Sequence, residues 1–167
     1  MNRFAVRVHP GELHFNAAHF ITFNRSCENL HGHNFHLSVE AWGEKTPDAF
    51  VIDFVLLNKL AANICEELHD GVLVPTESEE ITLSELENDM LEIRSYDKRF
   101  ILSRASCILL PITNTTAEML ASHISNRLIE RLRADRGIGN LQTLKVSVEE
   151  ADHQWGICLR EITHDQY

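Results

Sequence analysis

The sequence predicts an α+β fold, in which two helices cover one face of a four-stranded antiparallel sheet. Segments with alternating apolar residues lie in pairs near both ends of the chain, and two segments between them carry apolar residues at helical spacing. The order of these segments does not contain repeated βαβ units. With 167 residues, 44% of them hydrophobic, the chain fits a single globular domain.

The first two predicted strands lie within residues 4–42. Apolar and polar residues alternate from Phe4 to Phe15, and the interruption at Pro10-Gly11 predicts a bend or bulge in this strand. From Phe35 to Ala41 the odd-numbered residues are all apolar, which predicts the second strand.

Two helices are predicted from apolar stripes. The first runs from about residue 54 to 69, and Asp53 is expected to be its N-cap. At the start of the second helix, Thr115 and Glu118 have the spacing of a capping box. Gly137 and Gly139 are expected to end that helix.

The remaining segments are predicted to be mainly strands. Residues 71–111 indicate a β-rich excursion between the helices, although the apolar spacing within 83–90 fits a short helix equally well. Two closing strands are expected at 144–150 and 155–162.

Composition excludes several classes of partner. The 15 basic and 25 acidic residues give a net charge of −10, which argues against a nucleic-acid-binding protein. The N-terminal segment lacks the apolar run of a signal peptide or a membrane span, so we expect a cytoplasmic protein with no membrane partner. Four cysteines without C-x-x-C spacing indicate reduced thiols.

The chemistry is concentrated in a short histidine-rich region. His31 and His33 are two residues apart at the start of a strand, so both imidazoles project from one face. His19 reaches the same point if its strand pairs antiparallel with theirs, and three imidazoles with an open position form a catalytic zinc site. Chance clustering of ten histidines is the alternative. Cys27 is either a fourth ligand or a thiolate base beside the metal.

Several motifs carry a resemblance to a known family. The segments "FNAAHF", "CENLHGHNF", "VIDF", "NTTAEMLA" and "VSVEEA" resemble, in this order, the 6-pyruvoyltetrahydropterin synthase and 6-carboxytetrahydropterin synthase family. The resemblance covers roughly residues 4–75 and 107–160. The C-x-x-x-H-G-H spacing is closer to the bacterial 6-carboxytetrahydropterin synthases of queuosine biosynthesis.

The resemblance implies a fold and a reaction. The fold would be the tunnelling fold, assembled through trimers into a hexameric barrel with sites between subunits. His19, His31 and His33 match the family's zinc ligands, and Cys27 matches the thiol that acts as base on 7,8-dihydroneopterin triphosphate. Elimination of triphosphate would follow, with loss of acetaldehyde in the branch that forms 6-carboxytetrahydropterin.

The resemblance also implies residues that recognise the substrate. Glu150 matches the glutamate that accepts paired hydrogen bonds from the pterin ring, a geometry that suits a carboxylate. Strand alternation puts Glu149 on the other face, so one of the two can enter the pocket. Thr116 matches a residue near the pterin edge, although capping of the second helix explains this position without a ligand.

Two features depart from the family pattern. The family has an Asp-His pair after the first helix, whereas this chain has His69-Asp70, so either His69 reaches the site through an altered turn or the proton relay is changed. A helix C-terminal histidine that interacts with the dipole is the alternative. The segment at about 76–106 is an insertion, and its basic residues are either phosphate ligands or solvated charges: Lys98, Arg99 and Arg104.

Three functions are therefore open. The first is a zinc-dependent carbon–oxygen lyase that forms 6-carboxytetrahydropterin. The second is formation of 6-pyruvoyltetrahydropterin, or cleavage of dihydroneopterin, in the same pocket. The third is a zinc- and pterin-binding protein without turnover, which the reversed order of His69 and Asp70 favours.

Overall fold

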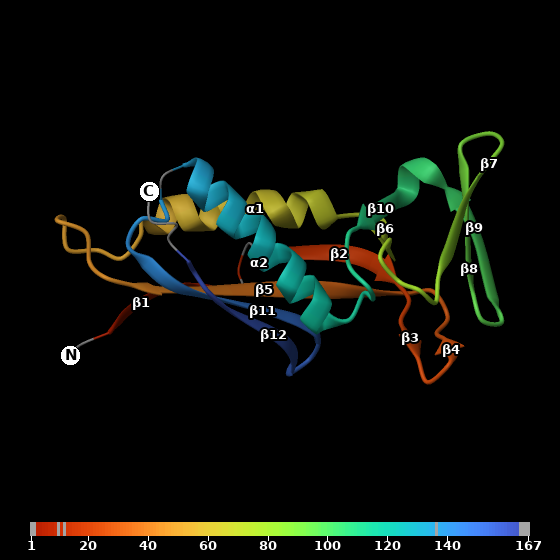
Figure 1. Cartoon of the computed structure of the whole chain (residues 1–167), viewed down its shortest axis with the longest axis horizontal. Helices are drawn as coiled ribbons and strands as arrows, with labels where there is room; N and C mark the ends of the chain where they lie inside the picture. Colours follow the sequence, from red (N-terminus) through yellow and green to blue (C-terminus); the bar gives the residue numbers. More distant parts are fainter. Residues whose placement is uncertain (1–2, 10, 12, 136, 164–167) are drawn as a thin grey trace.

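The computed structural model describes residues 3–9, 11, 13–135 and 137–163. Two α-helices lie on one side of a long sheet, and a smaller sheet stands at one end of it (Figure 1). The elements are β1 (Phe4–Val8), β2 (His14–His19), β3 (Thr22–Phe23), β4 (Ser26–Cys27), β5 (His31–Gly43), α1 (Phe54–Leu68), β6 (Gly71–Pro75), β7 (Thr82–Leu86), β8 (Met90–Ser95), β9 (Lys98–Ser103), a 3-10 turn (Arg104–Ser106), β10 (Cys107–Leu110), α2 (Ala117–Ala134), β11 (Leu141–Ala151) and β12 (Gln154–Glu161).

Strand β5 is the centre of the main sheet. It pairs antiparallel with both β1 and β2 along one edge and with β11 along the other. Its odd-numbered residues from Phe35 to Ala41 are fully buried, as the alternation predicts. The first predicted strand is two strands, and their registers on β5 differ, with Val8 opposite Val39 and His14 opposite His36. The interruption is therefore confirmed, although Pro10 itself lies outside the described residues.

The main sheet is larger than the predicted four strands, and it is not wholly antiparallel. Its order is β10-β6-β2-β5-β11-β12, with β1 also on β5. Strand β6 runs parallel to β2, and β10 runs parallel to β6. A parallel neighbour needs a long connection, and α1 provides it by returning the chain across the sheet. The prediction of four antiparallel strands included only the antiparallel part of the sheet, and it was wrong about the number of strands and about the parallel pairs.

Both helices pack on the same face of the sheet, as predicted, and the apolar side chains between helices and sheet form the main core. Helix α1 begins after Asp53, whose carboxylate accepts the amide proton of Val55 at 2.9 Å, so the predicted N-cap is confirmed. The predicted capping box at Thr115 is wrong. Thr116 is the N-cap of α2, and its hydroxyl accepts the Met119 amide proton at 3.3 Å. Thr115 is instead fully buried against β2.

The segment 76–106 folds as a separate three-stranded antiparallel sheet of β7, β8 and β9. The helix considered for 83–90 is wrong, because Leu83 pairs with Ile93 and Leu86 with Met90 in a hairpin. One face of this sheet closes a second apolar cluster, apart from the main core. The buried members of this cluster are Phe20, Cys27, Val74, Leu91, Ile93 and Cys107.

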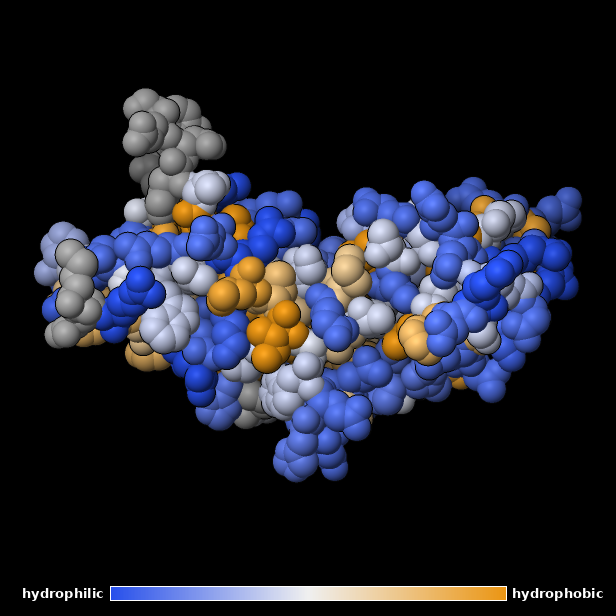
Figure 2. Space-filling model, turned by 60° about the horizontal axis from the view of Figure 1, so that its bottom comes forward, coloured by the Kyte–Doolittle hydropathy of each residue, from blue (hydrophilic) through white to orange (hydrophobic). Residues whose placement is uncertain are grey.

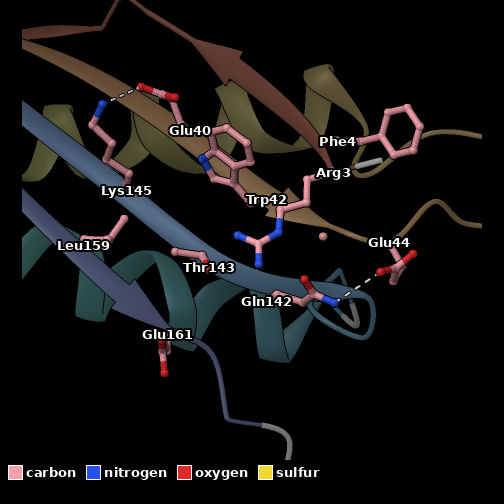
Figure 3. Close-up of a pocket in the computed structure, with 11 residues that line it drawn as sticks. Arg3, Phe4, Glu40, Trp42, Glu44, Gln142, Thr143, Lys145, Leu159 and Glu161 are labelled. Atoms are coloured by element: carbon pink, nitrogen blue, oxygen red, sulfur yellow. Dashed lines mark hydrogen bonds and ion pairs between the residues drawn. The ribbon is translucent and has the colours of Figure 1, made fainter. Parts of the chain in front are cut away.

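The face of the main sheet opposite the helices is open. Apolar side chains gather near its middle (Figure 2), and Ile157 and Leu159 of the edge strand β12 are 52% and 65% exposed. Beside them lies a hollow of about 400 Å³ with a partly charged lining (Figure 3). In it Lys145 Nζ donates to Glu40 Oε1 at 2.8 Å. No helix in the described part of the chain is long and apolar enough to span a membrane.

Candidate metal centre and active site

The pairing of β2 with β5 brings the three predicted histidines together. His19 stands directly opposite His31, and His33 follows two residues along β5 on the same face. One ligand atom from each of the three lies within 4.8 Å of the other two. They are the one such group of three or more histidine, cysteine, aspartate or glutamate residues found among the described positions. The predicted cluster therefore exists in the folded chain.

Backbone carbonyls set which nitrogen each imidazole presents. His19 Nδ1 lies 3.0 Å from the Thr115 carbonyl oxygen, and His31 Nδ1 lies 2.8 Å from the Asn29 carbonyl oxygen. A carbonyl can only accept, so both Nδ1 atoms carry the proton. Each Nε2 is then left with a free lone pair. Hydrogen bonds from Nδ1 to a backbone carbonyl commonly orient metal-binding histidines in this way.

Burial keeps His19 in its neutral form. The side chain is completely buried, and this burial lowers the pKa of His19 to about 4, with the Thr115 hydrogen bond acting in the opposite direction. His19 Nε2 is a buried atom without a hydrogen-bond partner. Leaving such an atom unpaired is costly unless it has another ligand. Three imidazoles with one orphaned Nε2 fit a bound metal ion better than they fit a structural role.

Glu150 reaches the same cluster from β11. Its Oε1 lies 3.7 Å from His33 Nε2 and 4.0 Å from His19 Nε2. Burial raises the pKa of the Glu150 carboxyl, while His33 and His31 lower it and Glu28 and Glu118 raise it further. Glu149 points to the other side, where its Oε1 accepts the His153 amide proton at 2.8 Å.

Cys27 belongs to the second apolar cluster rather than to the space around the histidines. The residue is 3% exposed and packs with Phe20, Leu91 and Ile93. Burial raises the pKa of the Cys27 thiol, and its Sγ donates to the Glu28 carbonyl at 3.5 Å. A base needs the thiolate, and this environment favours the protonated thiol.

The neighbour of Cys27 has the opposite environment. Cys27 and Glu28 are consecutive residues at the end of the β3–β4 hairpin, where Glu28 N donates to the Ile21 carbonyl at 2.9 Å. Successive side chains in extended backbone point to opposite sides. Glu28 is accordingly exposed, and its charge contributes to the raised pKa of Glu150. Its carboxylate is therefore near enough to the histidine site to act electrostatically on Glu150.

His69 and Asp70 lie on the other face of the sheet from the metal cluster. His69 Nδ1 accepts the Asn16 amide proton at 3.3 Å, and its ring lies 6.4 Å from that of His14. Asp70 has a left-handed backbone (φ 56°), which aspartate tolerates better than most residues, and it lines a hollow with Asn34. No hydrogen bond or ion pair joins this pair to the three histidines among the described residues, although Asp70 and His33 line the same hollow.

The remaining predicted positions have structural contacts. Thr116 caps α2. Arg99 Nε donates to Glu92 at 2.6 Å, on the outer face of the small sheet, and Arg104 donates to the Cys107 carbonyl at 3.3 Å. Lys98 alone of the three basic residues contacts the loop before His31, because its Nζ donates to Asn29 Oδ1 at 2.9 Å.

The sequence did not indicate two kinds of residue: those that act through their backbone carbonyls, and one whose side-chain orientation brings it toward the site. Thr115 and Asn29 orient imidazoles through carbonyl groups, which every residue type has, so no residue pattern indicates them. Glu28 was visible in principle. Alternation from a buried Cys27 predicts that the next side chain is exposed.

Comparisons with known proteins place the chain among its relatives. The family described as "6-pyruvoyl tetrahydropterin synthase" matches residues 11–161. A protein of Methanocaldococcus jannaschii named "Putative 6-carboxy-5,6,7,8-tetrahydropterin synthase" is 34% identical over 155 residues, covering 92% of this chain and 93% of its own. The solved 6-pyruvoyltetrahydropterin synthase of Plasmodium vivax is 28% identical, with a TM-score of 0.90 over 97% of this chain and 100% of its own. That of Plasmodium falciparum is also 28% identical, with a TM-score of 0.87 over 96% and 99%.

Proposed function

The chain belongs to the 6-pyruvoyl tetrahydropterin synthase family, and we propose that it is a zinc-dependent lyase acting on 7,8-dihydroneopterin triphosphate. The product would be 6-carboxy-5,6,7,8-tetrahydropterin. The observation that carries this product is the 34% identity, over nearly the whole of both chains, to a relative named for it. The three histidines and Glu150 on one sheet face support the presence of a pterin site.

The roles of the residues follow from their contacts. His19, His31 and His33 would hold Zn²⁺ through nitrogens freed by the carbonyl contacts. The ion would polarise a substrate oxygen and acidify the neighbouring C–H group. Glu150 would accept two hydrogen bonds from the pterin ring, because its carboxylate lies at the cluster and offers two oxygens side by side. Thr116 caps α2. It would also lie near the edge of the bound pterin ring, as the family resemblance implies.

The proton acceptor in this chain would be Glu28. It is exposed and acts electrostatically on Glu150, whereas Cys27 is buried with a raised pKa. Two solved variants of the Plasmodium vivax enzyme, with a TM-score of 0.90 to this chain, replace a glutamate described as catalytic. Cys27, the base that the family resemblance implies, is the alternative that the experiment below separates.

A second product also has a specific observation in its favour. The solved structures with TM-scores of 0.87 to 0.90 are named 6-pyruvoyltetrahydropterin synthases, and in one of them a glutamate is the catalytic residue, as proposed here. Formation of 6-pyruvoyltetrahydropterin would use the same histidines, Glu150 and base. The two products differ in mass, so one assay distinguishes them.

The protein would act in the cytoplasm as a homo-oligomer, either a trimer or a hexamer. The exposed Ile157 and Leu159 lie on β12, the last strand in the order of the main sheet. The outer edge of this strand has no partner strand among the described residues, which suits pairing with another copy. The partly charged hollow that Figure 3 shows suits a face lining a water-filled channel. His69 and Asp70, which make no hydrogen bond or ion pair with their own three histidines in the described part of the chain, would serve the site of a neighbouring copy.

Incubation of the zinc-loaded protein with 7,8-dihydroneopterin triphosphate, followed by mass spectrometry, tests the function. We expect 6-carboxytetrahydropterin with release of triphosphate and acetaldehyde. Release of triphosphate with the pyruvoyl product would favour the second candidate. Unchanged substrate, with zinc and pterin still bound, would contradict both and leave a binding protein.

The same assay identifies the base. Glu28→Ala should lower turnover by about 100-fold or more, since a positioned acid or base contributes about 10²–10⁴, while zinc content stays at one ion per chain. Cys27→Ala should keep most of the turnover. Glu87→Ala, an exposed glutamate in the turn of the β7–β8 hairpin, is the matched control. Loss of turnover in Cys27→Ala with zinc retained, and its retention in Glu28→Ala, would make Cys27 the base.

A further inference from the structure

We propose that Lys98 is a positioning residue of the metal centre, and that the inserted sheet β7–β9 presets the loop before His31 for metal binding. The inference rests on the metal site of the proposed function. It concerns a segment that lies outside the motifs carrying the family resemblance.

The inserted sheet holds this loop by apolar contacts first. Leu91 and Ile93 of β8 are buried in the second cluster together with Cys27. Cys27 thereby anchors the end of the β3–β4 hairpin under the insertion. The three residues that follow Cys27 lead directly into His31, so the anchor lies at the start of this loop.

A polar contact fixes the loop two residues later. Lys98 Nζ donates to Asn29 Oδ1 at 2.9 Å, and the same ammonium lies 3.9 Å from Asp97. The carbonyl of Asn29 in turn accepts the His31 Nδ1 proton at 2.8 Å. Two hydrogen bonds in series, from Lys98 to Asn29 and from His31 to Asn29, therefore connect the insertion to the proposed metal ligand.

This connection acts on the ligand in a defined way. The Asn29 carbonyl selects the His31 tautomer and fixes the ring plane, which aims Nε2 at His19 and His33. The Asn29 side chain is exposed, and it makes no other hydrogen bond with the described residues. Without Lys98 the carbonyl would sample more orientations, and part of the metal-binding free energy would be spent on ordering the loop.

The other basic residues of the insertion cannot take this role. Arg99 and Arg94 both donate to Glu92 on the outer face of the sheet. Arg104 donates to a carbonyl at the start of β10. Strand register explains why Lys98, and not its neighbours, reaches the loop. Lys98 is opposite Ser95, so its side chain lies on the same face of the sheet as Ile93 and Phe100. This face is turned toward Cys27.

Zinc affinity of the apo protein, measured by competition with a chromophoric chelator and without pterin, tests the proposal. Lys98→Met and Asn29→Ala should each weaken zinc binding by about 3–10-fold, less than the ~10–100-fold typical for a direct partner of a ligand. The double variant should be no weaker than either single variant, because both break one connection. Lys98→Arg should restore affinity to within about threefold, since it keeps the charge and a donor.

Lys59→Met is the matched control, since Lys59 is an exposed lysine on α1, and it should bind zinc like the unmodified chain. The Co²⁺-loaded proteins give a second readout, because a reoriented His31 changes the visible absorption bands. Unchanged zinc affinity and unchanged cobalt spectrum in Lys98→Met would overturn the proposal, and so would additive losses in the double variant. None of these readouts requires turnover, so they stand even if the proposed reaction fails.

Discussion

Thr115 makes two contacts that join the start of α2 to the end of β2. Its hydroxyl donates to the Phe20 carbonyl at 2.6 Å, and its own carbonyl accepts the His19 Nδ1 proton at 3.0 Å. The residue is fully buried, so neither contact is replaced by water. At the scale of single residues, the arrangement of the histidine cluster therefore depends on a residue outside it.

Thr115→Val should lower the free energy of unfolding by about 1–3 kcal/mol, because it keeps the shape and leaves the Phe20 carbonyl without its donor. Zinc affinity should fall as well, since the Thr115 carbonyl is held less firmly against His19. Urea unfolding of the apo protein and a zinc titration measure the two effects. Thr113→Val, at an exposed position nearby, is the control. Equal stability of the two variants would contradict this account.

At the scale of elements, the approach of α2 to β12 is unusually close. A Cβ atom on Gly156 would lie 2.3 Å from the backbone of Ala117 and Glu118, at the first turn of α2. Gly156 is opposite Val148 on β11, two residues before Glu150. The absence of a side chain at Gly156 thus allows the helix to settle on β12, beside the strand that carries Glu150.

Gly156→Ala should therefore separate α2 from β12 and destabilise the protein by about 1–3 kcal/mol or more, as overpacking does. The start of α2 also carries Thr115, so the same variant should weaken zinc binding. Gly139→Ala has open space around the added methyl group and serves as the control. Thermal unfolding compares them. A Gly156→Ala protein as stable as the control would mean that the helix is not held at this distance.

At the scale of the whole molecule, the described chain contains an incomplete set of groups around its histidines. Glu150 lies with its own cluster, whereas His69 and Asp70 face the opposite side of the sheet. The open face also exposes Ile157 and Leu159 on an edge strand. Association of several copies would cover these residues and bring the relay of one chain to the histidines of another.

Mixing of inactive variants tests this arrangement. His31→Ala and His69→Ala should each be inactive, and subunit exchange between them should restore about a quarter of the sites, since random mixing pairs an intact cluster with an intact relay in that share. His31→Ala mixed with Glu150→Ala should stay inactive, because both residues belong to one chain's cluster. Recovery in the second mixture, or none in the first, would contradict the division. Sedimentation before and after mixing confirms that oligomers exchanged.

The sequence by itself determined much of the local structure and which three histidines come together. Periodicity is a property of neighbouring residues, so β5, α1 and β11 follow from it, and alternation alone puts His31 and His33 on one face. Tertiary structure decided which groups from distant segments meet. The parallel strand β6, the Thr115 carbonyl on His19, and the burial of Cys27 under the inserted sheet all depend on such contacts. The physical reason is that direction and burial are set by packing between segments far apart in the chain, which no local pattern of residue types contains.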